Sequence, residues 1–473
     1  MGSSGVVRRM KCPPGRHTGW GDSMYEPLWT RGAELPVFSK LEEDIRTDVL
    51  IIGGGLAGLL CAYRLEQAGV DYALVEADRI CRGVTRNTTA KVTAQHGLIY
   101  HKLLRRLGLD RAKLYLLANQ RAVEEFRGLS REISCDFEEK DSFVYSLNDE
   151  RKLEREMEAL ERLHAPAELV ERLTLPFETA GAVRFPGQGQ FHPLKFAAGI
   201  AKGLNIFEQT PVREFRGNTV TTPKGTIRAE KMIICTHFPI LNKHGSYFLK
   251  QYQHRSYVLG LEGAPTLPGM YVDEADGGLS LRNAGGLLLL GGGGHRTGKE
   301  GGGWRELRAF TETHWPDARE KYRWAAQDCM TLDGAPYIGP YSARTPDLFV
   351  ATGFNKWGMT SSMVSAMILT DLVQGQENSY APAFAPSRSM LRPQLAVNAL
   401  ESTLNLLTPT TPRCPHMGCA LKWNRQEHSW DCPCHGSRFD GEGRLLDGPA
   451  TGDLEETLNN TFSRKGLCGI LMP

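Results

Sequence analysis

Apolar positions follow two different periods along the chain, and these periods predict where strands and helices lie. An apolar run begins at Asp48, a helical pattern follows it, and a second apolar run ends at Glu76. Short apolar runs bounded by glycine are typical of buried strands, so this segment predicts a strand, a helix and a second strand. Residues 101–165 carry apolar side chains at helical spacing, for example Leu103 and Leu107, and predict helices.

The later part of the chain is predicted to contain strands up to about residue 300. Short apolar runs there alternate with glycine and proline, which end regular structure and favour turns. The runs are Met232–Cys235, Tyr257–Leu261 and Leu287–Leu290, and a further run, Leu348–Ala351, precedes a helical pattern over Met359–Val373. A stretch with proline and serine follows Gly375 and predicts a linker.

These patterns divide the chain into four parts. Residues 1–46, rich in proline, glycine and charge, predict an N-terminal extension, and residues 47–376 predict a large α/β region. Residues 377–400 predict the linker, and residues 401–473 predict a small cysteine-rich module. The length of 473 residues agrees with more than one domain, since single domains rarely exceed about 250–300 residues.

Composition and charge exclude several classes of protein. Lys and Arg total 56 and Asp and Glu total 54, so the net charge of +2 provides no strong field for nucleic acid or acidic membranes. No apolar run approaches the roughly 20 residues of a transmembrane helix, and the N-terminus lacks the apolar stretch of a secretory signal. We therefore expect a cytoplasmic protein that binds no nucleic acid and has no transmembrane segment. Four of the 11 cysteines lie from Cys414 to Cys434, which indicates a local cluster rather than a secreted disulfide framework.

The first motif with chemical meaning is a glycine fingerprint after the first predicted strand. Gly53, Gly55 and Gly58 form G-x-G-x-x-G at the start of the predicted helix. Gly53 permits a tight turn, Gly55 lets a pyrophosphate approach the backbone, and Gly58 lets helix and strand pack closely. Glu76 lies 18 residues after Gly58, where a carboxylate can accept hydrogen bonds from ribose hydroxyls. The pattern predicts a dinucleotide site, and alone it leaves FAD and NAD open.

A distant segment favours FAD. Residues 352–373, TGFNKWGMTSSMVSAMILTDLV, follow a predicted strand and open a helix near Met359 and Thr360. With the fingerprint, this segment resembles the D-amino-acid-oxidase superfamily of FAD-dependent oxidoreductases, in which the positive end of the closing helix faces the flavin. The resemblance implies that FAD is bound by Gly53, Gly55, Gly58, Glu76, Gly353, Gly358, Met359 and Thr360. No second fingerprint for a nicotinamide cofactor is present.

The same resemblance implies how the large region is divided. FAD-binding parts with a Rossmann-type α/β fold are expected at about 47–100, 175–240 and 325–376, with an α+β substrate domain between them. The catalytic residues are not identified. His96 follows a Thr-rich loop expected beneath the flavin, and Lys356 precedes the closing helix, so both are candidates for contact with flavin or substrate. An ordinary hydrogen-bonded histidine and a solvated lysine are the alternatives.

The second motif lies in the cysteine-rich module. Residues 414–419 read CPHMGC and residues 432–437 read CPCHGS, so each segment offers Cys and His together. Zinc fingers separate a Cys pair from a His pair, whereas one Cys and one His in each loop suit a binuclear cluster. The pattern resembles the small, all-β Rieske [2Fe–2S] domain. By this resemblance, Cys414 and Cys432 would bind one iron, and His416 and His435 would bind the other.

Two further properties of the module follow from the Rieske resemblance. Cys419 and Cys434 correspond to the pair that forms a disulfide in electron-transfer Rieske proteins. The alternative is that both thiols stay reduced, as thiols in the cytoplasm usually do. Few residues separate the linker from Cys414, so the module is expected to be truncated at its N-terminal side.

The two cofactors together suggest a function. We expect FAD-dependent oxidation of a C–N bond in an amine or amino acid, with electrons relayed singly through the cluster to an unidentified acceptor. Two alternatives stay open. The chain could be a redox-sensing or interaction protein with vestigial flavin turnover, or electrons could flow in reverse from the cluster to the flavin.

Overall fold

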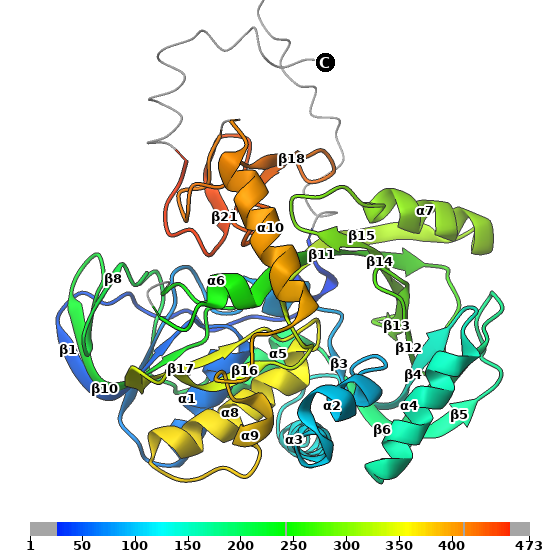
Figure 1. The fold of residues 1–473 in the computed structure, drawn as a ribbon, viewed down its shortest axis with the longest axis horizontal. Coiled ribbons are helices and arrows are strands. Elements are labelled where there is room, and N and C mark those ends of the chain that lie inside the picture. The colour runs from blue at the N-terminus through cyan, green and yellow to red at the C-terminus, as the bar shows by residue number, and fades with distance from the viewer. Residues whose placement is uncertain (1–25, 242–243, 410–411, 455–473) are drawn as a thin grey trace, which may run out of the picture.

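Two large β-sheets covered by helices form most of the fold, and a small third sheet lies on one side of them (Figure 1). The computed structural model describes residues 26–241, 244–409 and 412–454. The third sheet belongs to the C-terminal module, drawn in orange and red, which rests on the large region (Figure 1).

The first sheet contains the predicted dinucleotide strands. Its members are β1 (Ile45–Ile52), β2 (Tyr72–Val75), β7 (Ile206–Phe207), β8 (Glu214–Arg216), β9 (Thr219–Thr221), β10 (Thr226–Ile234), β16 (Tyr337–Ser342) and β17 (Thr345–Thr352). The order is β16-β17-β10-β1-β2-β7, and β1 pairs in parallel with both β2 and β10. Because parallel strands end at the same edge, the glycine fingerprint after β1 meets the residues that follow β2 and β10.

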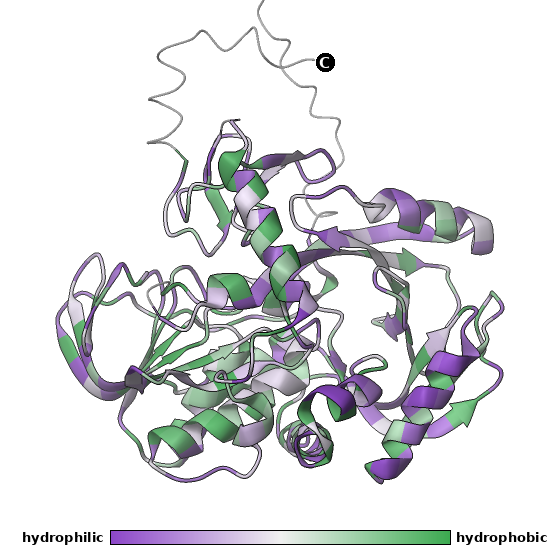
Figure 2. Ribbon diagram, viewed as in Figure 1, coloured by the Kyte–Doolittle hydropathy of each residue, from purple (hydrophilic) through white to green (hydrophobic). Residues whose placement is uncertain are grey.

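Helices cover this sheet and supply much of the hydrophobic core. They are α1 (Leu56–Gln67), α3 (Leu109–Leu129), α5 (Pro193–Ile200), α8 (Gly358–Val373) and α9 (Ala381–Phe384). Helix α8 packs against α1 and is buried on nearly all sides, and Figure 2 shows it largely in the green of hydrophobic residues. A helix that is apolar all round belongs in a core, so the start of α8 is held firmly in place.

The second sheet has nine strands, most of them antiparallel to their neighbours. Its members are β3 (Lys91–Val92), β4 (Glu138–Ser146), β5 (Glu168–Val170), β6 (Gly181–Gln190), β11 (Gln251–Glu262), β12 (Met270–Asp273), β13 (Ser280–Ala284), β14 (Leu287–Arg296) and β15 (Arg319–Thr331). The helices α2 (Tyr100–Leu107), α4 (Glu150–Arg162), α6 (Tyr247–Lys250) and α7 (Gly303–His314) and the 3₁₀ turns η2 (Leu28–Thr30) and η3 (Val84–Asn87) complete the large region. The order is β15-β11-β14-β13-β12-β4-β6-β3, with β5 beside β6.

The prediction of helices throughout residues 101–165 is wrong at β4. Phe143, Val144 and Tyr145 form an aromatic and β-branched run that suits a strand. Strand β4 pairs with β6 and β12, both far along the chain, and this tertiary pairing overrides the surrounding helical pattern. Helices flank it on both sides, as the periodicity predicted.

The C-terminal module is a helix followed by a four-stranded sheet. Its elements are α10 (Pro393–Leu407), β18 (Lys422–Asn424), β19 (Ser429–Asp431), β20 (Arg438–Phe439) and β21 (Leu445–Asp447). The predicted linker, 377–400, is packed against the large region and runs into α10. Within it, the buried guanidinium of Arg388 donates two hydrogen bonds of 3.0 Å to the carboxylate of Asp333.

The described part of the predicted N-terminal extension also packs on the large region. Trp29 is buried, and its indole Nε1 donates to the carbonyl oxygen of Thr88 at 2.7 Å. The backbone N–H of Leu41 donates to Thr210 Oγ1 at 3.1 Å. Residues 26–44 therefore run along the large region and are anchored to it by the buried side chains of Trp29 and Leu41.

Candidate functional site

A single large cavity runs from the glycine fingerprint to the C-terminal module. Its volume is about 1530 Å³, above the roughly 300–1,000 Å³ of pockets that hold drug-sized ligands. The predicted residues that line it are Gly53, Gly55, Glu76, His96, Lys356, Gly358 and Met359. Residues 426–428, 445–448 and 450–451 of the C-terminal module line its far end. The cavity can therefore hold a dinucleotide, a substrate and a contact with the module.

The glycines of the fingerprint stand where no side chain fits. A Cβ on Gly53, which has a φ of +110°, would lie 2.7 Å from the carbonyl oxygen of Cys235. A Cβ on Gly58 would lie 2.0 Å from the carbonyl oxygen of Gly53, so this glycine is needed for packing and does not line the cavity. Gly55 opens into the cavity, and its backbone can approach a phosphate closely.

Glu76 closes the same turn. Its Oε2 accepts a hydrogen bond of 2.6 Å from the backbone N–H of Gly54, and its Oε1 accepts one of 3.0 Å from Asp78. Burial raises the pKa of Glu76, and these backbone donors oppose that rise. The carboxylate is thus fixed at the end of β2, where it can receive a ribose hydroxyl.

A cationic side chain lies beside the fingerprint. Arg86, in η3, lines the cavity, and its buried Nε has no hydrogen-bond partner among the described residues. Thr85, next to it, accepts a hydrogen bond from the backbone of Leu56 at the start of α1. A glycine cradle, a carboxylate and an unsatisfied guanidinium nitrogen match the parts of an adenine dinucleotide, so the residues present fit FAD.

The closing helix α8 begins at the cavity, as the sequence predicted. Gly358 and Met359 line the cavity, and the positive end of this 16-residue helix faces it. Thr360 and Gly353 do not line it. The hydroxyl of Thr360 donates to the carbonyl oxygen of Thr93 at 3.1 Å, and a Cβ on Gly353 would lie 2.3 Å from Thr331. Both serve to hold the turn before α8.

His96 lines the cavity but already uses both ring nitrogens. Nδ1 lies 2.6 Å from the hydroxyl of Tyr115, and Nε2 lies 2.9 Å from Thr360 Oγ1 and from the carbonyl oxygen of Thr93. Its ring stacks on Trp357 at 5.0 Å, and burial lowers the pKa of His96 to about 3. These contacts favour the ordinary hydrogen-bonded histidine over a catalytic base.

The four predicted iron ligands come together in the module. The rings of His416 and His435 lie 4.9 Å apart, and Cys414 and Cys432 are buried and interact with each other. Burial lowers the pKa of His416 to about 3 and that of His435 to about 4, so both imidazoles are neutral, as iron ligands must be. Neither ring nitrogen of buried His435 makes a hydrogen bond of ordinary geometry to a described residue. Thiols, neutral imidazoles and unsatisfied nitrogens fit a Rieske cluster.

The second cysteine pair lies against this ligand set. The Sγ atoms of Cys419, Cys432 and Cys434 are within 4.8 Å of one another, and all are present as free thiols. The pairing of Cys419 with Cys434 as a disulfide therefore stays a prediction. Ser437 accepts a hydrogen bond of 3.0 Å from the backbone of Ala450, which fastens the loop after β21 over the same site.

The imidazole side of the module faces the large region, which the sequence did not indicate. The ring of Phe238 lies 6.3 Å from that of His416 and 5.9 Å from that of His435, between ring centres. Phe248, in α6, lies 6.2 Å from His435. Phe238 is buried and also lines the cavity, just after the Cys235 carbonyl that contacts the fingerprint. One aromatic ring therefore separates the two predicted ligand histidines from the cavity.

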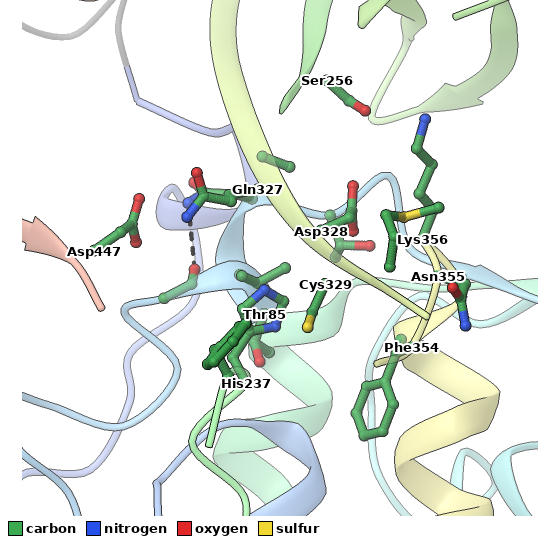
Figure 3. Close-up of a pocket in the computed structure, with 18 of the residues that line it drawn as sticks. Thr85, His237, Ser256, Gln327, Asp328, Cys329, Phe354, Asn355, Lys356 and Asp447 are labelled. Carbon is green, nitrogen blue, oxygen red and sulfur yellow. Dashed lines mark hydrogen bonds between the residues drawn. The ribbon is translucent and has the colours of Figure 1, made fainter. Parts of the chain in front are cut away.

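Hydrogen bonds fix this orientation of the module. Gln327 of β15 donates from Nε2 to the carbonyl oxygen of Gly436 at 2.8 Å, next to His435. Gly298 approaches Pro433 so closely that a Cβ on the glycine would lie 2.7 Å from it. Figure 3 shows Gln327 and His237 on the module side of the cavity and Lys356 with Asp328 on the other. Sequence reasoning missed Phe238, Gln327 and Asp328, because none belongs to a motif.

Comparison with known proteins finds two families. A family model described as FAD dependent oxidoreductase matches residues 48–372, and one described as Rieske [2Fe-2S] domain matches residues 396–458. YhfW of Bacillus subtilis (strain 168), described as a Rieske 2Fe-2S iron-sulfur protein, is 34% identical over 494 residues, which cover 91% of this chain and 97% of its own.

Two more distant relatives cover about three quarters of the chain. Gamma-glutamylputrescine oxidoreductase of Escherichia coli (strain K12) is 24% identical and covers 74% of this chain and 88% of its own. The crystal structure of glycine oxidase from Geobacillus kaustophilus matches this chain with a TM-score of 0.62 at 22% sequence identity. The match covers 73% of this chain and 99% of the glycine oxidase chain, so the two proteins share a fold over the matched part. Among the described helices, none is long and apolar enough to span a membrane.

Proposed function

The chain belongs to the family of FAD-dependent oxidoreductases and carries a Rieske [2Fe–2S] domain, and on this premise we propose that it oxidises a C–N bond of an amine or amino acid. In this proposal the electrons leave one at a time through the Rieske domain to an acceptor outside the chain. A cytoplasmic location is part of the same proposal.

The choice of substrate class rests on a relative and on the shape of the site. Gamma-glutamylputrescine oxidoreductase, by its name, acts on an amine, and it covers most of the large region. When bound, FAD would supply a two-electron acceptor for C–N oxidation and the cluster a one-electron acceptor. Gly53, Gly55, Glu76 and Arg86 would hold the dinucleotide, and the start of α8 would offer positive potential at the cavity.

The observation that carries the relay is the position of Phe238. Its ring lies against both ligand histidines, His416 and His435, and it lines the cavity on its other side. Electron tunnelling falls steeply with distance, so a single intervening ring favours transfer between the cavity and the module. Phe238 and Phe248 both pack on the ring of His435, which is buried. A sensor with vestigial turnover would have no need of this arrangement.

An anaerobic stopped-flow experiment tests the proposal. Purified protein with both cofactors is mixed with a panel of amines and amino acids, and flavin absorbance is followed together with the EPR signal of the reduced cluster. We expect an active substrate to bleach the flavin first and to reduce the cluster afterwards. Flavin bleaching that never reaches the cluster would exclude the relay, and reduction of neither centre by any amine would exclude the substrate class.

A further inference from the structure

Two opposite charges face the same part of the cavity without pairing with each other. Asp328 projects from β15 and Lys356 from the turn before α8, and Figure 3 shows both side chains pointing into the cavity, with Lys356 reaching toward Ser256. Among the described residues, neither side chain makes a hydrogen bond or an ion pair. Asp328 is partly buried, whereas Lys356 is exposed, and both side chains are open to the cavity. Because no described residue pairs with either charge, both are available to a ligand that carries the opposite charges at matching positions.

The backbone holds the two charges at a fixed separation. The turn before α8 is fastened to β15 by Asn355, whose backbone N–H donates to the carbonyl oxygen of Cys329 at 3.0 Å. Asn355 Oδ1 accepts a hydrogen bond of 2.8 Å from the backbone of Thr331. Asn355 and Lys356 have φ values of 51° and 72°, in the left-handed region that such residues rarely adopt. Strain of this kind is typical of functional sites, and here it aims Lys356 into the cavity beside Asp328.

The surroundings leave these two groups as the main charges at this end of the cavity. Burial raises the pKa of Asp328, and Lys356 and His237 oppose that rise. Burial lowers the pKa of Lys356, and Asp328 and Asp276 oppose it. His254, opposite Asp328 in the pairing of β11 with β15, has a pKa lowered to about 3 by burial and by Lys356, and is neutral. A ligand here meets one carboxylate and one ammonium group, with Asp276 at the exposed edge.

We infer that Asp328 binds the α-ammonium group and Lys356 the carboxylate of an amino-acid head group, and that the substrate is a diamino acid oxidised at its second nitrogen. An ammonium group held by a carboxylate keeps its proton, whereas C–N oxidation needs a neutral amine. The nitrogen at Asp328 is therefore not the one that reacts. The large cavity leaves room for a side chain that carries the reacting amine away from this pair.

The inference rests on the proposed function, because FAD is its oxidant. At the second nitrogen, the C–H bond breaks and a C=N bond forms. The hydrogen leaves with two electrons to FAD, and the nitrogen releases one proton to water. Hydrolysis of the C=N bond then gives an aldehyde and ammonia, so atoms and electrons balance.

Binding of a head group that has no second nitrogen tests the inference independently of oxidation. The probes are norleucine, which has both charges, hexanoate, which lacks the ammonium group, and hexylamine, which lacks the carboxylate. Anaerobic calorimetry measures their dissociation constants with the holoenzyme and with Asp328→Asn and Lys356→Gln. We expect either substitution to weaken norleucine binding about tenfold or more, the usual effect of removing one charged hydrogen bond. Hexanoate should respond only to Lys356→Gln, and hexylamine only to Asp328→Asn.

Matched surface variants and lysine complete the experiment. Asp347→Asn and Lys224→Gln remove the same charges from exposed positions and should leave all affinities unchanged. Unchanged norleucine affinity in both cavity variants, or oxidation of norleucine itself, would overturn the inference. Norleucine binding as expected, with no oxidation of lysine, ornithine or any member of the amine panel, would mean that the proposed function fails while the head-group site of Asp328 and Lys356 holds. If lysine is oxidised but neither Asp328→Asn nor Lys356→Gln alters the affinity for norleucine, the proposed function holds and the inferred head-group site is wrong.

Discussion

Arg255 of β11 and Glu427 of the Rieske domain form a buried ion pair across 172 positions of the chain, with Nε 3.0 Å from Oε1. Glu427 also receives a hydrogen bond of 2.8 Å from Arg438. Arg438 in turn lies 3.0 Å from Asp431 and 3.2 Å from Asp447, so one continuous network joins the large region to the domain that holds the cluster. This network determines which side of the Rieske domain faces the cavity.

We predict that Glu427→Gln destabilises the docked Rieske domain by about 3–5 kcal/mol, because Arg255 would be left as a buried charge without its partner. The measurements are the thermal unfolding midpoint and the rate at which protease cleaves the domain. A second ion pair between the same parts, Lys299 with Glu401 at 2.8 Å, is more exposed and provides the control. Glu401→Gln should cost less than about 1 kcal/mol. Equal effects of the two substitutions would contradict the role given to Arg255.

The same pair makes docking sensitive to acid. Burial alone would raise the pKa of Glu427, but Arg255 and Arg438 hold it at about 2, below its ordinary value of 4.5. A carboxyl group whose pKa is lowered by folding stabilises the folded state when the pH is above its ordinary pKa. For Glu427 this contribution is lost as the pH falls from about 4.5 toward 2. The full contribution is on the order of 3 kcal/mol. We predict that wild type and Glu427→Gln differ most in stability near neutral pH and converge in acid. A difference that stays constant down to about pH 3 would exclude Glu427 as the titrating group.

Local patterns predicted the family, the fold class and both cofactors, and the comparisons confirm these predictions. The fingerprint and the two cysteine-histidine loops are short continuous segments whose residue types are dictated by the group they bind. Strand β4 could not be predicted, because its partners β6 and β12 come later in the chain and outweigh the helical pattern around it.

The sequence could not predict how the FAD site and the Rieske domain are placed relative to each other, and the reason is physical. Phe238 touches His435, and Arg255 touches Glu427, only because the fold brings distant segments together. Phe238 lies in the loop after β10 and Arg255 on β11, and neither belongs to a sequence motif. Asp328 was missed in the same way, since a carboxylate on a strand acquires meaning only beside Lys356 in a cavity.

We predict that Gly58→Ala reduces FAD binding and stability. Its Cβ would lie 2.0 Å from the carbonyl oxygen of Gly53, a backbone atom that can move away only by displacing the turn between β1 and α1. Overpacking of this kind costs about 1–3 kcal/mol. The ratio of FAD to protein after purification and the thermal midpoint are the measurements. Gly128→Ala is the control, because a Cβ at exposed Gly128 meets nothing within 4 Å and Gly128 does not line the cavity, and it should retain FAD. Full FAD content in Gly58→Ala would contradict the described turn.

We predict that Phe238→Ala slows reduction of the cluster without slowing reduction of the flavin. The substitution removes the ring between the ligand histidines and the cavity and lets water enter, which weakens the electronic path from one site to the other. Stopped-flow traces for the two centres, recorded with the same reductant, separate the two rates. Phe238→Leu fills much of the volume with another apolar side chain and should retain more of the transfer rate than the alanine variant. The iron content of each variant serves as the control for an intact cluster. If alanine leaves the rate of cluster reduction unchanged while iron content is full, the electrons do not cross at Phe238.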